Sequence, residues 1–312
     1  MLTKNRVDHS VVLRDDQLSD QTWALITGAS QGLGRALADV CAGLGMDLAL
    51  VALPNSGLAQ AAQEIAGQYG VQTAYLETDL TAQGSPEALA QWALDNRMPV
   101  SMLINNAGVG YNSKFEHSTL RENESCILLN NLALVKITRL LLPELRRHNR
   151  AYVLNVASLA AFFPMPFMPV YAPSKAFILN FSLALREEMR HTPVRVSVLC
   201  PNGIRTNPEC TGKIESLGLM ARLTCMDPEQ VASYAIQGML ADKAVIVPGW
   251  LNQAIAAIGK FAPRPLVSAV VGAFWGRTAR QGLPTHPHLT SPIEGLTITH
   301  MFAECQFPDA SM

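Results

Sequence analysis

A short apolar segment, a glycine-rich turn and an alanine-rich helix follow one another directly near the start of this chain. The apolar segment is WALIT at 23–27, the turn is GASQGLG at 28–34, and RALADVCAGL at 35–44 has the composition of a helix. Glycines allow the backbone to turn tightly and let the helix pack close to the strand. A buried strand that leads through such a turn into a helix is typical of an α/β fold.

The rest of the chain repeats this alternation of apolar strands and helices. We expect further strands at 46–52, 72–78, 100–104, just before Ser158, at 194–199 and at 244–247. Helices are expected at 58–69, from 85, at 122–147, through YAPSK and after 227. With 312 residues, 49% of them hydrophobic, the chain is long enough for one large α/β domain.

Charge and cysteine content exclude several classes of protein. A net charge of -1 gives no basic field for nucleic acid, so we expect no nucleic-acid partner. The six cysteines show no CxxC spacing and no neighbouring histidine cluster, which predicts reduced thiols and no metal site. The N-terminus lacks an apolar signal core, and no apolar run reaches the ~18 residues of a membrane span. We expect a cytoplasmic protein, with peripheral membrane contact left open.

The glycine turn has the spacing of a phosphate-binding loop. Its first glycine permits the turn, its second lets the backbone approach a pyrophosphate, and its third allows close helix packing. Free N–H groups at the helix N-terminus and two polar side chains then face the anion. A purely structural turn is the alternative. The cofactor-binding residues predicted here are Gly28, Ser30, Gln31, Gly32, Leu33 and Gly34.

The ends of the second and third strands bear on the choice of cofactor. An acid after the second strand would bind the adenosine ribose hydroxyls, but LPNS stands at 53–56. A 2′-phosphate is therefore not repelled, and Asn55, Ser56 and Arg35 are candidate donors to it. The sequence favours NADP(H) over NAD(H). Asp79 and Leu80 are assigned to the adenine side, with a turn or helix cap as the alternative for Asp79.

Small and amide residues follow the fourth strand as NNAG at 105–108. They suit a backbone that passes close to a bound ring, so Asn106, Ala107 and Gly108 are predicted to bind the cofactor. Asn130 and Asn131 interrupt the long apolar helix that comes next. A buried Asn needs polar partners, which a water or a backbone carbonyl beside the site would supply.

The segment from Ser158 to YAPSK carries the candidate chemistry. Tyr171 and Lys175 are four residues apart and share one face if the segment is helical. A neighbouring ammonium favours the phenolate, so we expect Lys175 to lower the pKa of Tyr171. Because a surface Tyr and Lys with a Ser cap would give the same local pattern, the assignment depends on the rest of the chain.

Five motifs in order resemble the short-chain dehydrogenase/reductase family. They are TGASQGLG at 27–34, NNAG at 105–108, Asn130, Ser158 and YAPSK at 171–175, within a match that runs from 23 to 248. The resemblance implies a Rossmann-type, doubly wound parallel sheet with the nicotinamide lying over NNAG. We therefore expect an N-terminal extension at 1–21, a catalytic domain at 22–248 and a C-terminal helical extension and tail at 249–312.

The resemblance also assigns a catalytic tetrad to Asn130, Ser158, Tyr171 and Lys175. Tyr171 exchanges a proton with the substrate oxygen, Ser158 holds that oxygen, and Lys175 binds the nicotinamide ribose. Asn130, preferred to Asn131 because of its separation from Thr138, holds a water. Thr206 contacts the nicotinamide amide, although Asn202 departs from the glycine usual before it. Pro173 is tolerable in the first helical turn.

The apolar loop LAAFFPMPFMPV at 159–170 predicts the wall of an apolar pocket, although burial beneath its own domain is the alternative. Residues 207–226 resemble the family's substrate lid, and Asp227 begins a capping-box spacing. Two apolar helices within 245–276 can cover the pocket, join subunits or lie on a membrane, and their few cations favour the first two.

We expect reduction of an apolar ketone, such as a 3-oxoacyl chain or a steroid-like ring, by a homodimer or homotetramer. The alternatives are a cofactor-binding scaffold and an epimerase or dehydratase.

Overall fold

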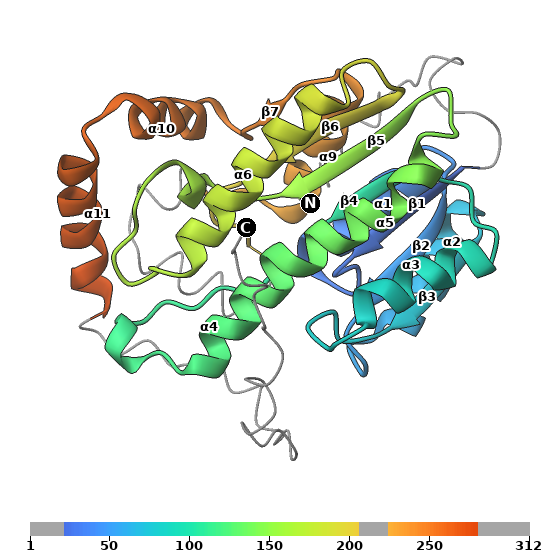
Figure 1. The fold of residues 1–312 in the computed structure, drawn as a ribbon, viewed down its shortest axis with the longest axis horizontal. Helices are drawn as coiled ribbons and strands as arrows, with labels where there is room; N and C mark the ends of the chain where they lie inside the picture. Colours follow the sequence, from blue (N-terminus) through green and yellow to red (C-terminus); the bar gives the residue numbers. More distant parts are fainter. Residues whose placement is uncertain (1–21, 206–223, 280–312) are drawn as a thin grey trace, which may run out of the picture.

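The computed structural model describes residues 22–205 and 224–279, which form a seven-stranded parallel sheet flanked by helices (Figure 1). The strand order is β3-β2-β1-β4-β5-β6-β7. The strands are β1 (Trp23–Thr27), β2 (Asp47–Ala52), β3 (Thr73–Glu77), β4 (Val100–Asn105), β5 (Ala151–Val156), β6 (Val194–Leu199) and β7 (Val245–Ile246). The order reverses between β1 and β4, so a crevice opens at the carboxyl ends of these two strands. The predicted α/β, doubly wound fold is confirmed.

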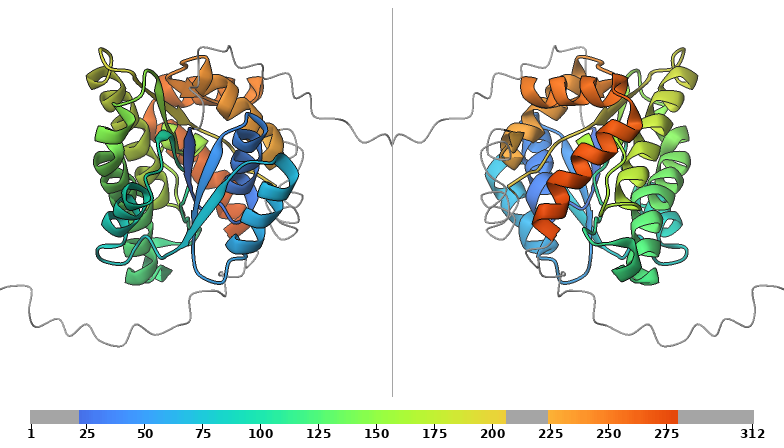
Figure 2. Two further views of the ribbon diagram at one scale, coloured as in Figure 1. Left: turned by 90° about the vertical axis from the view of Figure 1, so that its right-hand side faces the viewer. Right: turned by 90° about the vertical axis from the view of Figure 1, so that its left-hand side faces the viewer.

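Helices cover both faces of the sheet (Figure 2). They are α1 (Gly32–Gly43), α2 (Leu58–Tyr69), α3 (Ser85–Asp95), α4 (Leu120–Ile127), α5 (Leu134–Leu145), α6 (Tyr171–Glu188), α9 (Pro228–Leu240), α10 (Trp250–Phe261) and α11 (Arg264–Ala279). Alternate strand residues point to opposite faces. Ile26 packs beneath α1, α2 and α9, whereas Leu25 packs beneath α3 and α5. Both faces of the central strands are buried, as their continuous apolar runs indicate.

Two predicted helix starts are wrong in detail. Ser85 does not cap α3, because Gly84 occupies the capping position at φ 80° and Ser85 is the first helical residue. The Ser85 hydroxyl instead lies 2.8 Å from the Thr78 hydroxyl. Asp227 does occupy the capping position of α9, but its carboxylate accepts from Arg205 at 3.2 Å rather than from the helix.

The long helix predicted at 122–147 consists of three parts. A π-helical segment, Leu128–Ala133, joins α4 to α5 and contains both Asn130 and Asn131. Within the described ranges, Leu120–Leu145 is the helix whose length and hydropathy would allow it to cross a membrane, and 44% of its most apolar stretch is buried in the protein. Ile137 and Leu141 of α5 pack against the sheet. At the other end, α4 begins with a Thr119–Glu122 capping box that was not predicted from the sequence.

The two helices predicted near the C-terminus are present as α10 and α11 and follow the short strand β7. Asn252 is buried and fixes α10 to the domain, because its Nδ2 donates to the Thr224 and Pro248 carbonyls at 3.0 and 2.8 Å. Its Oδ1 accepts from Asn202 at 3.2 Å. Asn202, which departs from the family pattern, therefore joins the loop after β6 to the C-terminal helices.

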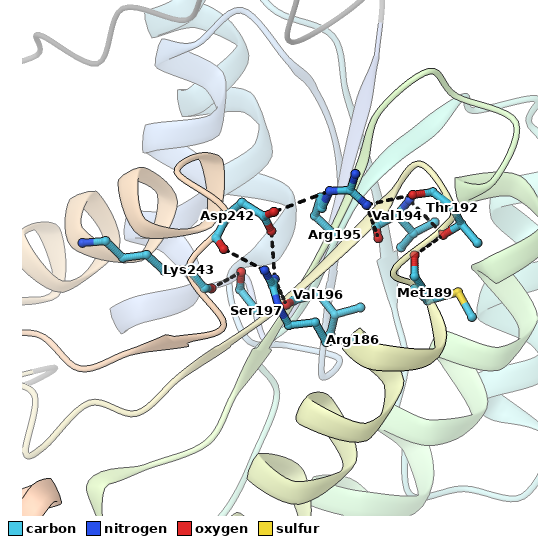
Figure 3. Close-up of polar contacts among 9 residues, drawn as sticks. All are labelled: Arg186, Met189, Thr192, Val194, Arg195, Val196, Ser197, Asp242 and Lys243. Atoms are coloured by element: carbon cyan, nitrogen blue, oxygen red, sulfur yellow. Dashed lines mark hydrogen bonds and ion pairs between the residues drawn. The ribbon is translucent and has the colours of Figure 1, made fainter.

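A polar cluster fastens the C-terminal end of α6 to β6 and to the turn before β7 (Figure 3). Arg186 donates to the carbonyls of Val196 and Asp242 and forms an ion pair with the Asp242 carboxylate at 2.8 Å. Arg195 approaches the same carboxylate at 3.6 Å. Since α6 begins with Tyr171, this cluster fixes the far end of the helix that carries the candidate chemistry.

Replacement of Asp242 tests this cluster. Asp242 has φ 57°, a left-handed conformation that Asn tolerates better than Ala. We expect Asp242→Ala to lower the free energy of unfolding by about 1–2 kcal/mol, through loss of the ion pair and added backbone strain. Asp242→Asn should lose roughly half as much. Urea unfolding measures both variants, and equal losses would show that the backbone conformation contributes nothing.

Candidate active site

Thr27, at the end of β1, joins the glycine loop to the NNAG loop. Its buried hydroxyl accepts from the backbone N–H groups of Asn106 and Ala107, each at 3.0 Å. The Asn106 side chain returns the contact by donating to the carbonyls of Thr27 and Gly28 at 2.9 and 3.1 Å. These bonds hold together the two sides of the crevice between β1 and β4. Asn106 thus has a structural role beside its predicted cofactor contact.

The predicted phosphate-binding residues line a cleft together with NNAG. The cleft is bordered by Gly28, Gln31, Gly32, Leu33, Gly34, Asn106, Ala107 and Gly108. Gly28 and Gly32 have φ of 68° and 58°, and a Cβ on Gly34 would collide with the Gly28 carbonyl and lie 2.6 Å from Asn106 Nδ2. Some of these residues form the first turn of α1, where the backbone N–H groups have no partner within the helix. Ser30 and Gln31 lie in the same loop.

The residues expected around the adenosine are differently placed. Arg35 is held by ion pairs to Asp39 at 3.1 Å and Glu64 at 2.9 Å, so its guanidinium already has two carboxylate partners. Asn55 is exposed at φ 60° and the buried Ser56 hydroxyl has no protein partner among the described residues. The Asp79 carboxylate accepts from Thr81 N and Oγ1, which is the turn-cap alternative, and Leu80 is buried.

Beneath the cleft, a buried chain of polar side chains crosses the sheet. Asn105 Nδ2 donates to Asn155 Oδ1 at 2.8 Å and lies 2.9 Å from Thr138 Oγ1. Asn155 Nδ2 donates to Ser182 Oγ at 2.9 Å. Because α5 carries Thr138 and α6 carries Ser182, these bonds fix both helices to the ends of β4 and β5. Buried polar groups need such partners, and here they set the positions of the neighbouring helices.

The π-helical segment brings two adjacent asparagines onto the first turn of α6. Asn130 Nδ2 lies 2.9 Å from Ser174 Oγ, and Asn131 Nδ2 donates to the Ser174 carbonyl at 2.8 Å. Asn130 Oδ1 also accepts a hydrogen bond from the Val109 N–H, and its Nδ2 donates to the Val109 carbonyl. Neighbouring residues of a regular α-helix point in different directions, whereas the wider π turn allows both amides to reach one turn of another helix.

Tyr171, Ser158 and Lys175 lie next to one another, and Lys175 lies beside Gly108, which borders the cleft. Tyr171 is the first residue of α6, so Pro173 falls in the first turn, where the sequence analysis required it to lie. The Ser158 hydroxyl hydrogen-bonds the Tyr171 side chain and also accepts from Ala160 N at 3.1 Å. Lys175 is buried, donates to the Val156 carbonyl at 3.0 Å and lies 5.8 Å from the centre of the Tyr171 ring.

Gly108, the last residue of NNAG, and Gly110 lie close to three of the four predicted catalytic side chains. A Cβ on Gly108 would lie 3.0 Å from Asn130 Oδ1 and 3.2 Å from Lys175 Nζ. A Cβ on Gly110 would lie 2.6 Å from the Tyr171 ring. The two glycines therefore leave the space in which these side chains lie.

The expected lowering of the Tyr171 pKa is wrong for the protein alone. Burial raises the pKa of Tyr171, and the hydrogen bond to Ser158 offsets only part of that rise. Burial also lowers the pKa of Lys175 to about 8. The ammonium donates to the Val156 carbonyl rather than to the phenol oxygen, so desolvation is the largest effect on the pKa of Tyr171.

Sequence reasoning missed several residues that organise the site. Thr27, Asn155, Ser174 and Asn131 hold the predicted residues in place through hydrogen bonds. A signal existed for Thr27 and Asn155, since each stands at or near the carboxyl end of a buried strand. Thr206 and residues 207–223 of the predicted lid lie outside the described residues.

Replacement of Thr27 tests the link across the crevice. Thr27→Val removes the acceptor of two backbone N–H groups, so we expect a loss of about 1–3 kcal/mol in the free energy of unfolding. Thr27→Ser keeps the hydroxyl and should retain most of the stability. Chemical denaturation compares the two variants, and an unchanged stability of Thr27→Val would show that the hydroxyl contributes nothing.

Burial of Lys175 predicts a pH-dependent cost to stability. Its folded pKa of about 8 lies below the unfolded value, so stability rises as pH increases through the interval from about 8 to the unfolded pKa. Lys175→Met should therefore raise the free energy of unfolding by roughly 1–3 kcal/mol at pH 7. The gain should shrink towards pH 10. Denaturation of the cofactor-free protein at both pH values measures it, and a pH-independent difference would contradict the prediction.

Comparison with known proteins gives the chain a family. The family model described as short chain dehydrogenase matches residues 22–212. A ketoacyl reductase of Nostoc, HetN, is 37% identical over 57% of this chain and 61% of its own length. A very-long-chain 3-oxoacyl-CoA reductase of Phaeosphaeria nodorum is 35% identical over 57% of this chain and 53% of its own. The matched part thus spans less than two thirds of either relative.

Two solved structures share the fold. A 7beta-hydroxysteroid dehydrogenase structure has a TM-score of 0.73 at 23% identity and covers 80% of this chain and 96% of its own. A short-chain dehydrogenase of Sphingobium yanoikuyae in complex with NADPH has a TM-score of 0.65 at 26% identity, over 85% and 98% of the two chains. With more than half of its residues matched by the family model, the chain belongs to the short-chain dehydrogenase family.

Proposed function

We propose that this protein is an oxidoreductase that reduces the ketone of an apolar substrate with a nicotinamide cofactor. The observation that carries the proposal is the grouping of Tyr171, Ser158 and Lys175, with Lys175 beside Gly108 of the cleft that the glycine loop and NNAG border. The cleft offers free backbone N–H groups at the start of α1, which suit a pyrophosphate. The same residues would also serve the reverse oxidation of the secondary alcohol.

In this proposal Tyr171 supplies the proton. Its raised pKa keeps the phenol protonated at neutral pH, which suits a donor to the oxygen of a carbonyl as it becomes an alcohol. Ser158 donates a hydrogen bond to the same oxygen and stabilises the negative charge that develops there. When bound, the reduced nicotinamide supplies the hydride to the carbonyl carbon. The product is the alcohol, and Tyr171 must then recover a proton.

Lys175 and Asn130 are placed to assist that recovery. The ammonium has a pKa near 8, so it exchanges protons readily near neutral pH. Asn130 Oδ1 and Lys175 Nζ both border Gly108, where the nicotinamide ribose is expected. Lys175 would bind the ribose hydroxyls, and Asn130 would hold the water that connects Lys175 to solvent.

We propose NADP(H) as the preferred cofactor. No acid follows β2, and the exposed Asn55 amide is available as a donor to a 2′-phosphate, whereas the buried Ser56 hydroxyl would have to turn outward to donate. The relative from Sphingobium yanoikuyae binds NADPH. Arg35 contributes less than its position suggests, because Asp39 and Glu64 neutralise it.

A 3-oxoacyl chain or a steroid-like ring is the proposed substrate class. The loop that leads to Tyr171 contributes Phe167, Pro169 and Val170 to a small pocket beside the phenol. The relatives include a ketoacyl reductase and a 3-oxoacyl-CoA reductase. The pocket also contains Ser118 and Asn123, which would contact a polar part of the substrate.

Oxidation of NADPH and NADH tests the proposal with 3-oxoacyl thioesters, ring ketones and small polar aldehydes. We expect turnover of the bulky ketones with a preference for NADPH of about tenfold or more. Tyr171→Phe should lose at least about 100-fold in kcat and keep cofactor binding. Turnover confined to small aldehydes would contradict the substrate class. A scaffold would show no turnover, and an epimerase or dehydratase would consume no cofactor stoichiometrically.

A further inference from the structure

The exposed residues described on α10 and α11 are apolar except for Gln253. On α10 the exposed apolar positions are Trp250, Ala254, Ala257 and Ile258, and on α11 they are Leu266, Ala269, Val270 and Ala273. These spacings place each set on one side of its helix. We refer to the two sets together as the C-terminal apolar face. A helix that faces water normally presents charged side chains on its outer side.

Exposure of the large side chains on this face is unusually high. Trp250 is 79% exposed, Ile258 63%, Leu266 60% and Val270 61%. Scattered apolar residues are common on protein surfaces, but a contiguous apolar surface marks an interaction site. Here the residues follow each other along two consecutive helices.

Contacts on the inner sides of both helices fix this orientation. The buried Asn252 joins α10 to the domain through the Thr224 and Pro248 carbonyls. Gly259 on α10 lies so close to Phe163 that an added Cβ would collide with its ring. Gly272 on α11 packs on Pro166, which a Cβ would meet at 3.2 Å. The helices therefore cannot rotate their apolar sides inward without losing these contacts.

The charge of this segment indicates the kind of partner. Residues 243–279 contain no Asp or Glu, and their four basic residues are Lys243, Lys260, Arg264 and Arg277. In a contact between two copies of the chain, a two-fold axis would place the same cationic segment against itself. An anionic lipid surface supplies the missing negative charge, and each nearby cation strengthens such binding by roughly fivefold. A tryptophan at the edge of an apolar surface also suits a membrane interface.

The place of the two helices in the fold agrees with a membrane contact. Figure 1 shows α10 and α11 as an outer arm on the side of the molecule opposite β3, and Figure 2 shows α11 crossing that end. The arm packs on the 159–170 loop, which precedes Tyr171. Contact with a bilayer at this arm would leave that loop one helix layer away from the lipid.

We propose that the C-terminal apolar face binds the surface of membranes that contain anionic lipid, with the helices lying in the interface rather than crossing it. The inference goes beyond the proposed reaction and does not depend on it. It revises the expectation that few cations disfavour a membrane role, because the sequence of this segment contains cations and no carboxylates.

Flotation of the full chain with vesicles tests the proposal. We expect the protein to float with phosphatidylcholine vesicles that contain about 30% phosphatidylserine, and to bind less to phosphatidylcholine alone or at high salt. Ile258→Glu and Leu266→Glu should each reduce the bound fraction by about tenfold. Leu94→Glu is the matched control, because Leu94 is 43% exposed on the distant helix α3. It should bind as the unchanged chain does.

Several results would overturn this inference. The unchanged chain could fail to float with either vesicle, or Leu94→Glu could reduce binding as strongly as Leu266→Glu. Light scattering could show a dimer that Leu266→Glu dissociates, which would assign the face to a second copy. Vesicle binding that appears only after removal of residues 280–312 would show that this segment, rather than a membrane, occupies the C-terminal apolar face of the full chain. Turnover of a water-soluble ketone, measured on the same variants, is expected to stay unchanged and tests the proposed reaction separately.

Discussion

A buried ammonium that has no carboxylate partner among the described residues is the constraint on which the candidate site depends. Lys175 instead donates a hydrogen bond to the backbone carbonyl of Val156. Burial of a charge is costly unless other groups compensate, and the lowered pKa of Lys175 expresses that cost. The fold tolerates it because the surrounding elements are fixed by other bonds. Asn105, Asn155 and Ser182 fix the strands to α6, so the helix cannot move to let the ammonium reach water.

The order of strands and helices could be predicted because it depends on local patterns. Apolar runs, glycine turns and helix-forming segments each predict their own element, and their succession predicts a parallel sheet. β1, α2 and β6 begin and end where the sequence places them. The helix starts at Ser85 and Asp227 were less predictable. In each case the expected capping side chain has another partner outside its helix: Ser85 lies against Thr78, and Asp227 accepts from Arg205.

Residues of the candidate site were predictable by type, whereas the groups that hold them were not. Resemblance to a family supplies Asn130, Ser158, Tyr171 and Lys175, and the geometry brings all four together. It does not reveal the π-helical segment that allows Asn131 to reach Ser174. A π-helical turn and a regular α-helix show nearly the same pattern of apolar residues in the sequence. The prediction of a lowered pKa for Tyr171 failed for a related reason. Spacing along a helix shows which groups are near, but the balance between burial and charge depends on everything packed around them.

The C-terminal apolar face bears on how an apolar ketone would reach Tyr171. A long-chain substrate dissolves poorly in water and partitions into bilayers, since each buried methylene contributes about 0.8 kcal/mol. A protein that held its α10 and α11 arm against the lipid would meet such a substrate at a far higher local concentration than in solution. The arm formed by α10 and α11 follows the last strand and lies beyond the region matched by the family model, residues 22–212. Catalytic geometry and membrane contact therefore reside in separate parts of the chain, joined where Phe163 and Pro166 pack on Gly259 and Gly272.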